Sequence, residues 1–178
     1  MRNNKLIFKK GFTLIELIVA LGVFMVVMTM TLSAFLNIMD IQKKTEAFRK
    51  VNDNLNFAME AMMREIREGK SYCPSGCTDD KTFSFVNKDG DTVKYEWDET
   101  GKYIKRKKST DEPLRMTSDG IKITRLSFFV SGEETYPSGD RQQPLVTISI
   151  GGESGEKEKL KSKLNLQATV SQRKLDSQ

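Results

Sequence analysis

The chain is 178 residues long, with 38% hydrophobic and 30% charged residues. This length suffices for one modest domain beside a membrane segment, so we expect no second globular domain. The formal net charge is +5, but four of the 29 basic residues lie before residue 12, and the remaining 25 face 24 acidic residues. A nearly neutral remainder disfavours nucleic-acid binding as the main task of the chain.

An apolar run follows a short leader whose charged residues are Arg2, Lys5, Lys9 and Lys10. The run covers residues 12–36 and contains one charged side chain, Glu16. About 20 apolar residues are enough for a helix to cross a bilayer, so we expect a membrane span. A cleaved secretory signal is the alternative, but its apolar core is shorter, about 7–15 residues, and no good small-x-small cleavage site follows Leu36. The basic leader places the N-terminus in the cytoplasm and the rest of the chain outside.

Helical periodicity continues beyond the apolar run. No proline or glycine interrupts residues 23–68, and apolar side chains recur there in steps of three, four and seven, at Ile38, Ile41, Phe48, Val51, Leu55, Ala58, Met59, Met62 and Ile66. We predict one helix from Phe12 to about Glu68, with Gly69 as its C-terminal stop. At 1.5 Å per residue such a helix is on the order of 85 Å long.

The rest of the chain has the pattern of strands. Segments 82–86, 92–97, 103–106, 121–130, 145–150 and 164–170 are rich in β-formers, and most of them alternate apolar and polar residues. Turn-forming residues separate them, as at Asp89-Gly90 and Thr100-Gly101. One apolar and one polar face per strand predict an antiparallel sheet that covers the amphipathic helix, an α+β fold.

Two cysteines, Cys73 and Cys77, lie in the part of the chain expected outside the cytoplasm. We expect a disulfide between them, with free thiols as the alternative. Zinc is disfavoured because the chain has no histidine and only these two thiols. Acidic residues near the hairpins offer oxygens to calcium, but such residues are more often solvated turn formers, so we predict no metal site; they are Asp79, Asp80, Asp89, Asp91, Asp98 and Glu99.

The sequence contains no residue pattern that indicates a catalytic role. Without histidine, no serine or cysteine has a histidine base, and no pair of carboxylates stands out for acid–base work. We therefore expect no enzyme, no catalytic residue and no cofactor. The cluster Lys105 to Lys108 is read either as a solvated strand end or as a DNA contact, and the sequence leaves both open.

The stretch Lys10-Gly11-Phe12-Thr13-Leu14-Ile15-Glu16-Leu17 resembles the processing signature of the type IV pilin and pseudopilin superfamily. The resemblance implies that a prepilin peptidase cleaves between Gly11 and Phe12 and that the new amine of Phe12 is methylated. It also implies that Glu16 pairs with the N-terminal amine of a neighbouring subunit. Such a pair offsets the roughly 2.5–3.5 kcal/mol that a lone acid costs within a membrane. Cleavage also removes the cationic leader, so that the subunit can be lifted from the bilayer.

The same resemblance implies an organisation and a set of partners. Residues 1–11 are the leader peptide, 12–36 the transmembrane and filament-core half of the helix, 37–68 its amphipathic half, and 69–178 a β-rich globular domain. The precursor is a single-pass protein of the cytoplasmic (inner) membrane and later joins a periplasmic or extracellular filament. Its partners are the peptidase, other major and minor subunits, the inner-membrane assembly platform and the membrane; nucleic acid is uncertain.

Two features point to a minor subunit. Ser33 occupies the place where major subunits usually carry a proline. Residues 48–67 resemble J-type minor pseudopilins and W-type minor pilins, which often show an ME-x-x-x-R-[DE]-[IL]-R run, although ordinary helix packing explains the same residues. We expect a minor subunit that primes or caps a type IV pilus or a type II secretion pseudopilus. A major pilin, a membrane-anchored DNA-binding competence pilin and a permanently anchored binding domain remain as alternatives.

Overall fold

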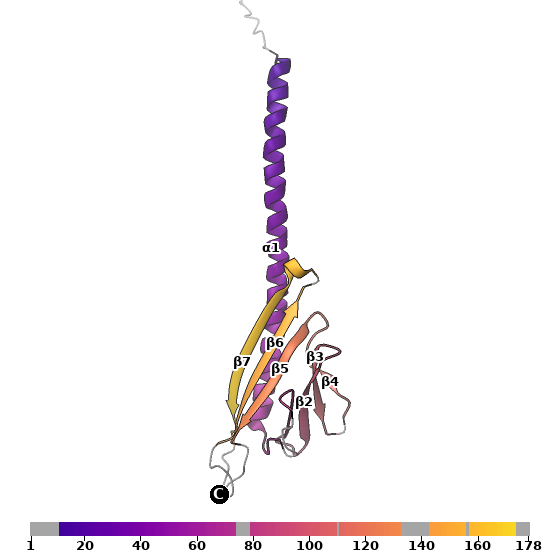
Figure 1. The fold of residues 1–178 in the computed structure, drawn as a ribbon, viewed down its shortest axis with the longest axis vertical. Helices are drawn as coiled ribbons and strands as arrows, with labels where there is room; N and C mark the ends of the chain where they lie inside the picture. The colour runs from indigo at the N-terminus through magenta and orange to yellow at the C-terminus, as the bar shows by residue number, and fades with distance from the viewer. Residues whose placement is uncertain (1–10, 74–78, 110, 133–142, 156, 174–178) are drawn as a thin grey trace, which may run out of the picture. The chain divides into compact units, whose positions relative to one another are not determined.

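A computed structural model describes residues 11–73, 79–109, 111–132, 143–155 and 157–173 (Figure 1). The chain divides into two compact units, residues 1–42 and residues 43–178. A single helix, α1 (Leu14–Glu68), contributes to both units, and all strands belong to the second.

The first unit contains the apolar half of α1. Its side chains from residue 11 to residue 39 are all exposed, which is expected of a segment whose natural surroundings are lipid or other helices. The hydroxyls of Thr29, Thr31 and Ser33 donate to carbonyls three or four residues earlier in the helix, at 2.8–3.0 Å. These polar groups therefore need no water, and they fit an apolar environment.

In the second unit, α1 buries one stripe of side chains against the strands. The buried residues are Ala47, Val51, Leu55, Ala58, Met59, Met62 and Ile66. The predicted stripe began earlier, but Ile38, Ile41 and Phe48 are 53%, 65% and 46% exposed. The covering strands reach as far as Lys44, whose carbonyl accepts the hydroxyl of Ser162 at 3.1 Å. Ile38 and Ile41 therefore precede the covered part of α1, whereas Phe48 lies on its exposed side.

The first four strands form an antiparallel sheet in the order β1-β2-β3-β4. They are β1 (Thr82–Val86), β2 (Thr92–Asp98), β3 (Tyr103–Lys108) and β4 (Leu114–Arg115). Alternation along β1 directs Phe83 and Phe85 into the core, where the ring of Phe83 lies 5.4 Å from that of Phe128. The β1–β2 turn is closed by Asn87, whose side-chain oxygen accepts the N–H groups of Asp89 and Asp91 at 3.0 and 2.9 Å.

The last three strands form a second antiparallel sheet in the order β5-β6-β7. They are β5 (Lys122–Ser131), β6 (Leu145–Ser154) and β7 (Ser162–Ser171), with a short 3-10 helix, η1 (Glu158–Leu160), before β7. The fold class is confirmed as α+β, but one sheet was expected and the described residues form two. They stay separate because β5 bonds to loops of the first sheet: Phe128 donates to the Asp80 carbonyl and Ile123 to the Lys102 carbonyl, each at 2.7 Å.

The helix contacts the second sheet closely. A Cβ added to Gly152 of β6 would meet the Leu55 side chain at 3.1 Å, so this glycine lets the strand approach α1.

Carbonyl groups in the last turn of α1 have hydrogen-bond partners outside the helix. The Ile66 carbonyl accepts the N–H of Gly69 at 3.0 Å and the hydroxyl of Tyr72 at 2.8 Å, and the Arg67 carbonyl accepts the N–H of Arg173 at 2.8 Å.

Candidate processing and assembly site

The predicted processing site lies immediately before α1. Gly11, Phe12 and Thr13 are exposed and lie outside the helix, which begins at Leu14. The Thr13 hydroxyl accepts the N–H of Glu16 at 3.3 Å, and the Thr13 carbonyl accepts the N–H of Leu17 at 3.2 Å. Thr13 is therefore the N-cap of α1, in a Thr-x-x-Glu sequence typical of a capping box.

The surroundings of the Gly11–Phe12 bond are open. Apart from its chain neighbours, no described residue has a heavy atom within 4 Å of a Cβ built on Gly11, and Phe12 is 85% exposed. Packing against the residues that the structure describes therefore gives no reason for a glycine at this position. An external surface that approaches the backbone closely would give one.

Glu16 lies in the first turn of α1, where the partial positive charge of the helix N-terminus favours a carboxylate. Its side chain is exposed, and among the described residues none forms an ion pair with it. The carboxylate is thus available on the otherwise apolar first half of α1. By length and composition α1 is able to cross a membrane, and none of its most apolar part is buried within the chain.

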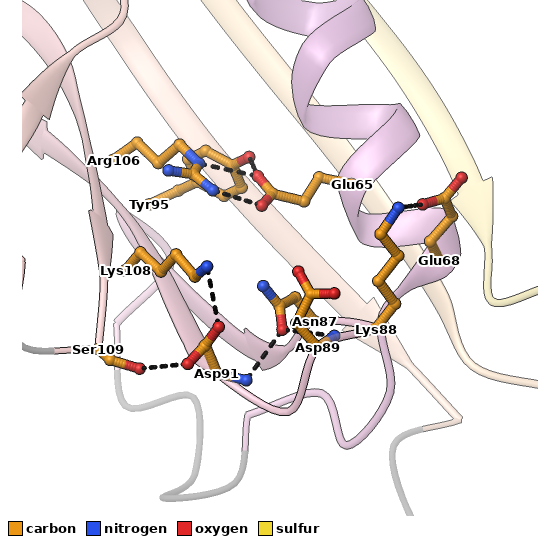
Figure 2. Close-up of polar contacts among 10 residues, drawn as sticks. All are labelled: Glu65, Glu68, Asn87, Lys88, Asp89, Asp91, Tyr95, Arg106, Lys108 and Ser109. Carbon is orange, nitrogen blue, oxygen red and sulfur yellow. Dashed lines mark hydrogen bonds and ion pairs between the residues drawn. The ribbon is translucent and has the colours of Figure 1, made fainter.

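A second polar site joins α1 to the first sheet (Figure 2). Glu65 extends from the helix to Arg106 of β3, which donates from Nε at 2.9 Å and from Nη2 at 2.5 Å. The Tyr95 hydroxyl of β2 donates to the same carboxylate. Burial alone would raise the pKa of Glu65, but hydrogen bonds from Arg106 and Tyr95 outweigh it and lower the pKa below its usual value. Burial, followed by the bond to Glu65, raises the pKa of Tyr95.

This contact was not predicted from the sequence. Glu65 lies in the amphipathic segment 37–68 and Arg106 in the basic cluster Lys105 to Lys108, and no local pattern in the sequence pairs them. One signal was present: Glu65 lies between Met62 and Ile66, two apolar residues of the buried stripe, where a carboxylate needs a partner.

The basic cluster Lys105 to Lys108 is largely neutralised within the chain. Lys105 lies 2.5 Å from Asp98, Lys108 lies 2.9 Å from Asp91, and Arg106 pairs with Glu65. The N–H of Gly101 and then the ammonium of Lys105 lower the pKa of Asp98 to about 2. Three of the four charges thus have intramolecular partners, which removes most of the support for a DNA contact.

The acidic residues considered as calcium ligands do not gather at one site. Glu99 pairs with Lys81 at 2.6 Å. Among the residues that the structure describes, no three histidine, cysteine, aspartate or glutamate residues gather as a metal ion would require. Cys73 is buried, at 7% exposure, whereas Cys77 lies outside the described residues, so the disulfide between them stays a prediction.

Comparison with known families identifies the N-terminal region. Residues 8–32 match the family described as the prokaryotic N-terminal methylation motif. No curated protein and no solved structure gives a significant match. The match includes Gly11, Phe12 and Glu16, and the long N-terminal apolar helix with antiparallel sheets on its second half has the α+β arrangement of type IV pilin-like proteins.

Proposed function

We propose that this chain is a minor pilin or pseudopilin that primes or caps a type IV pilus or a type II secretion pseudopilus. The observation that carries the proposal is the methylation motif at residues 8–32, which coincides with an exposed, apolar helix capped by Thr13. The role is structural, and its two chemical steps, cleavage and methylation, are performed by other proteins on Gly11 and Phe12.

The geometry around Gly11 supports cleavage there. A protease binds its substrate in an extended conformation, and the Gly11–Phe12 bond lies outside α1, two residues before the first helical residue. The open space around Gly11 gives a peptidase room to approach the backbone. Cleavage then converts Phe12 into a free N-terminal amine close to the start of the apolar helix.

Glu16 supports the assembly step. An isolated carboxylate in the membrane costs roughly 2.5–3.5 kcal/mol on insertion scales, and Glu16 has no ion-pair partner among the described residues. The amine of Phe12 on a neighbouring subunit supplies the missing partner. A misplaced neighbour leaves both charges unpaired, so the pair also selects the register between subunits.

Two observations favour a minor subunit over a major one. At Ser33, where major subunits usually carry a proline, α1 is uninterrupted and the Ser33 hydroxyl bonds to the Thr29 carbonyl. The run at residues 59–67 resembles the J-type and W-type minor subunits, although the packing of Met59, Met62 and Ile66 accounts for part of it. We also propose that the leader ends at residue 11, the filament-core half of the helix at residue 36 and its amphipathic half at residue 68.

Mass spectrometry of the chain recovered from cells that possess the peptidase tests the processing step. We expect an N-terminus at methylated Phe12, and Gly11→Val should reduce cleavage at least tenfold. Gly22→Val is the matched control, because Gly22 is a second glycine with no heavy atom within 4 Å of its Cβ position. An intact leader on the unaltered chain would contradict the proposal.

A second experiment separates assembly from processing. Glu16→Gln keeps the shape of the side chain and removes its charge, so the variant should be cleaved normally but recovered from sheared filaments at a tenth of the usual level or less. Filament recovery equal to that of the unaltered chain would exclude the assembly role of Glu16.

A further inference from the structure

The two sheets have four edges: that of β1 is bonded to other residues, that of β5 is bonded at two positions, and that of β4 is two residues long. Outside β1, Lys70 exchanges backbone hydrogen bonds with Val86 at 2.8 and 2.9 Å, and Cys73 donates to Ser84 at 2.8 Å. The edge of β5 is bonded to the carbonyls of two loops, as described above. The fourth strand, β4, has only two residues and offers almost no edge.

The remaining edge belongs to β7, which has ten residues and pairs only with β6. In Figure 1 it lies at the margin of its sheet, with β6 and β5 on one side of it. Within the described part of the chain, no backbone hydrogen bond outside the β6 ladder involves residues 162–171. One long row of backbone donors and acceptors is therefore open.

This edge also lacks the usual protection against pairing. Proteins block exposed edges with charges, prolines or bulges, yet residues 164–171 contain no charged residue, proline or glycine. The one charged residue of β7, Lys163, lies at the start of the strand, 65% exposed and 3.7 Å from Glu153 of β6. A long, uncharged, unblocked edge is either an aggregation hazard or a docking edge, and filament subunits are selected for ordered contacts.

The two faces of β7 define the strand that fits beside it. Leu164, Leu166 and Ala168 are half-buried and pack against the core, so part of each side chain is left for a neighbour. Asn165, Gln167 and Thr169 are exposed on the other face. A complementary strand alternates in the same way, with apolar side chains toward α1 and polar ones outward.

The direction of β7 excludes a second copy of this strand as an antiparallel partner. Ser162 bonds to Lys44 and Arg173 bonds to Arg67, so β7 runs in the same direction as α1. An antiparallel β7–β7 pair would therefore place the two Lys43 ends at opposite ends of the joined sheet. Only six residues separate Lys43 from the end of the apolar run, a reach of about 25 Å at most. Two such copies do not fit one membrane.

A parallel pair of β7 strands related by a twofold axis is also disfavoured. That axis turns one sheet over, so the row of Leu164 and Leu166 in one copy would lie beside the row of Asn165 and Gln167 in the other. Parallel pairing is in addition slightly weaker per residue than antiparallel pairing. The β1 edge of a second copy is bonded to other residues, its β5 edge is bonded at two positions, and its β4 edge is two residues long.

We propose that the open edge of β7 docks an extended strand of a different subunit of the assembly, which adds a fourth strand to the sheet β5-β6-β7. The open backbone N–H and C=O groups of residues 164–171 supply the affinity. The half-buried leucines of β7 select apolar side chains on the inner face of the docked strand. The exclusion of a second copy rests on the proposed membrane insertion and assembly of this chain.

Site-specific photo-crosslinking in intact cells tests this edge. Benzoylphenylalanine is placed at Asn165, Gln167 or Thr169 of the full-length chain, and the attachment sites are mapped by mass spectrometry. Phe129→benzoylphenylalanine is the matched control, because Phe129 is an aromatic residue of β5 in the same sheet and is 70% exposed. We expect all three probes to attach to one segment of another polypeptide, with the attachment site moving two residues for each two-residue step of the probe.

Three outcomes would overturn the proposal: attachment to β7 of a second copy, attachment without a fixed register, or yields no higher than that of the control. Gln167→Lys should lower the yield from the Asn165 probe at least fivefold, while Ser149→Lys on the central strand should not. The mature N-terminus is measured in the same cells. An uncleaved leader together with a register-fixed attachment would reject the proposed processing and retain the docking edge.

Discussion

The contact of Glu65 with Arg106 makes a direct prediction about stability. Arg106→Met keeps much of the side-chain length and removes the charge, so it leaves the Glu65 carboxylate unpaired. Removing one partner of a fully buried pair costs about 3–5 kcal/mol. Here the two side chains are 26% and 23% exposed, so water replaces part of the lost contact and we expect a cost of about 2 kcal/mol.

Urea unfolding of the full chain in detergent measures this cost. Trp97 is the only tryptophan and packs against the core, so its fluorescence reports on the sheet that contains Arg106. The double variant Glu65→Met with Arg106→Met is the control, because it leaves no unpaired charge and only the neutral Tyr95 hydroxyl loses its acceptor, so it should be more stable than Arg106→Met. The stabilising role of the contact is refuted if Arg106→Met lowers the free energy of unfolding by less than about 0.5 kcal/mol. It is also refuted if the double variant is less stable than both Arg106→Met and the unaltered chain.

The same contact predicts a dependence on pH. The pKa of Glu65 is lower in the folded chain than in the unfolded one, so the carboxylate stabilises the fold at pH values above its unfolded pKa. That contribution is lost as the pH falls from the unfolded value through the folded one. Arg106→Met should remove this part of the acid sensitivity. Urea unfolding of both chains at pH 7 and below pH 4 measures it. If the unaltered chain and Arg106→Met lose the same free energy of unfolding between these pH values, Glu65 does not contribute as proposed.

Three further outcomes are expected. Thr13→Val removes the N-cap at a cost of about 1 kcal/mol, so hydrogen exchange of the amide that it caps should become about fivefold faster, whereas Thr13→Ser should change little. Gly152→Val forces a side chain against Leu55 and should destabilise the chain by about 1–3 kcal/mol, while Gly120→Ala, which meets nothing within 4 Å, should have little effect. The carboxyl of Asp98 should titrate at about pH 2 by NMR, and a midpoint near its usual value would show that its bonds do not persist in solution.

Local patterns accounted for most of the secondary structure. The helix ends at Glu68 as predicted, because Gly69 follows an uninterrupted periodic segment. The segment 82–86 coincides with β1, and the other predicted strands agree with β2, β3, β5, β6 and β7 to within four residues at each end. The two-residue strand β4 was missed, because a strand that short has no alternation to detect.

The apolar run and the methylation motif at residues 8–32, which includes Gly11, Phe12 and Glu16, could be recognised without a structure, because both are short segments read in order along the chain. Division into two sheets, the pairing of Glu65 with Arg106 and the open edge of β7 were decided only by the tertiary structure. Each depends on residues far apart in the sequence, and alternation gives the face of a strand but not its neighbour. The basic cluster shows the same limit: its charges are visible in the sequence, but their partners are set by the fold.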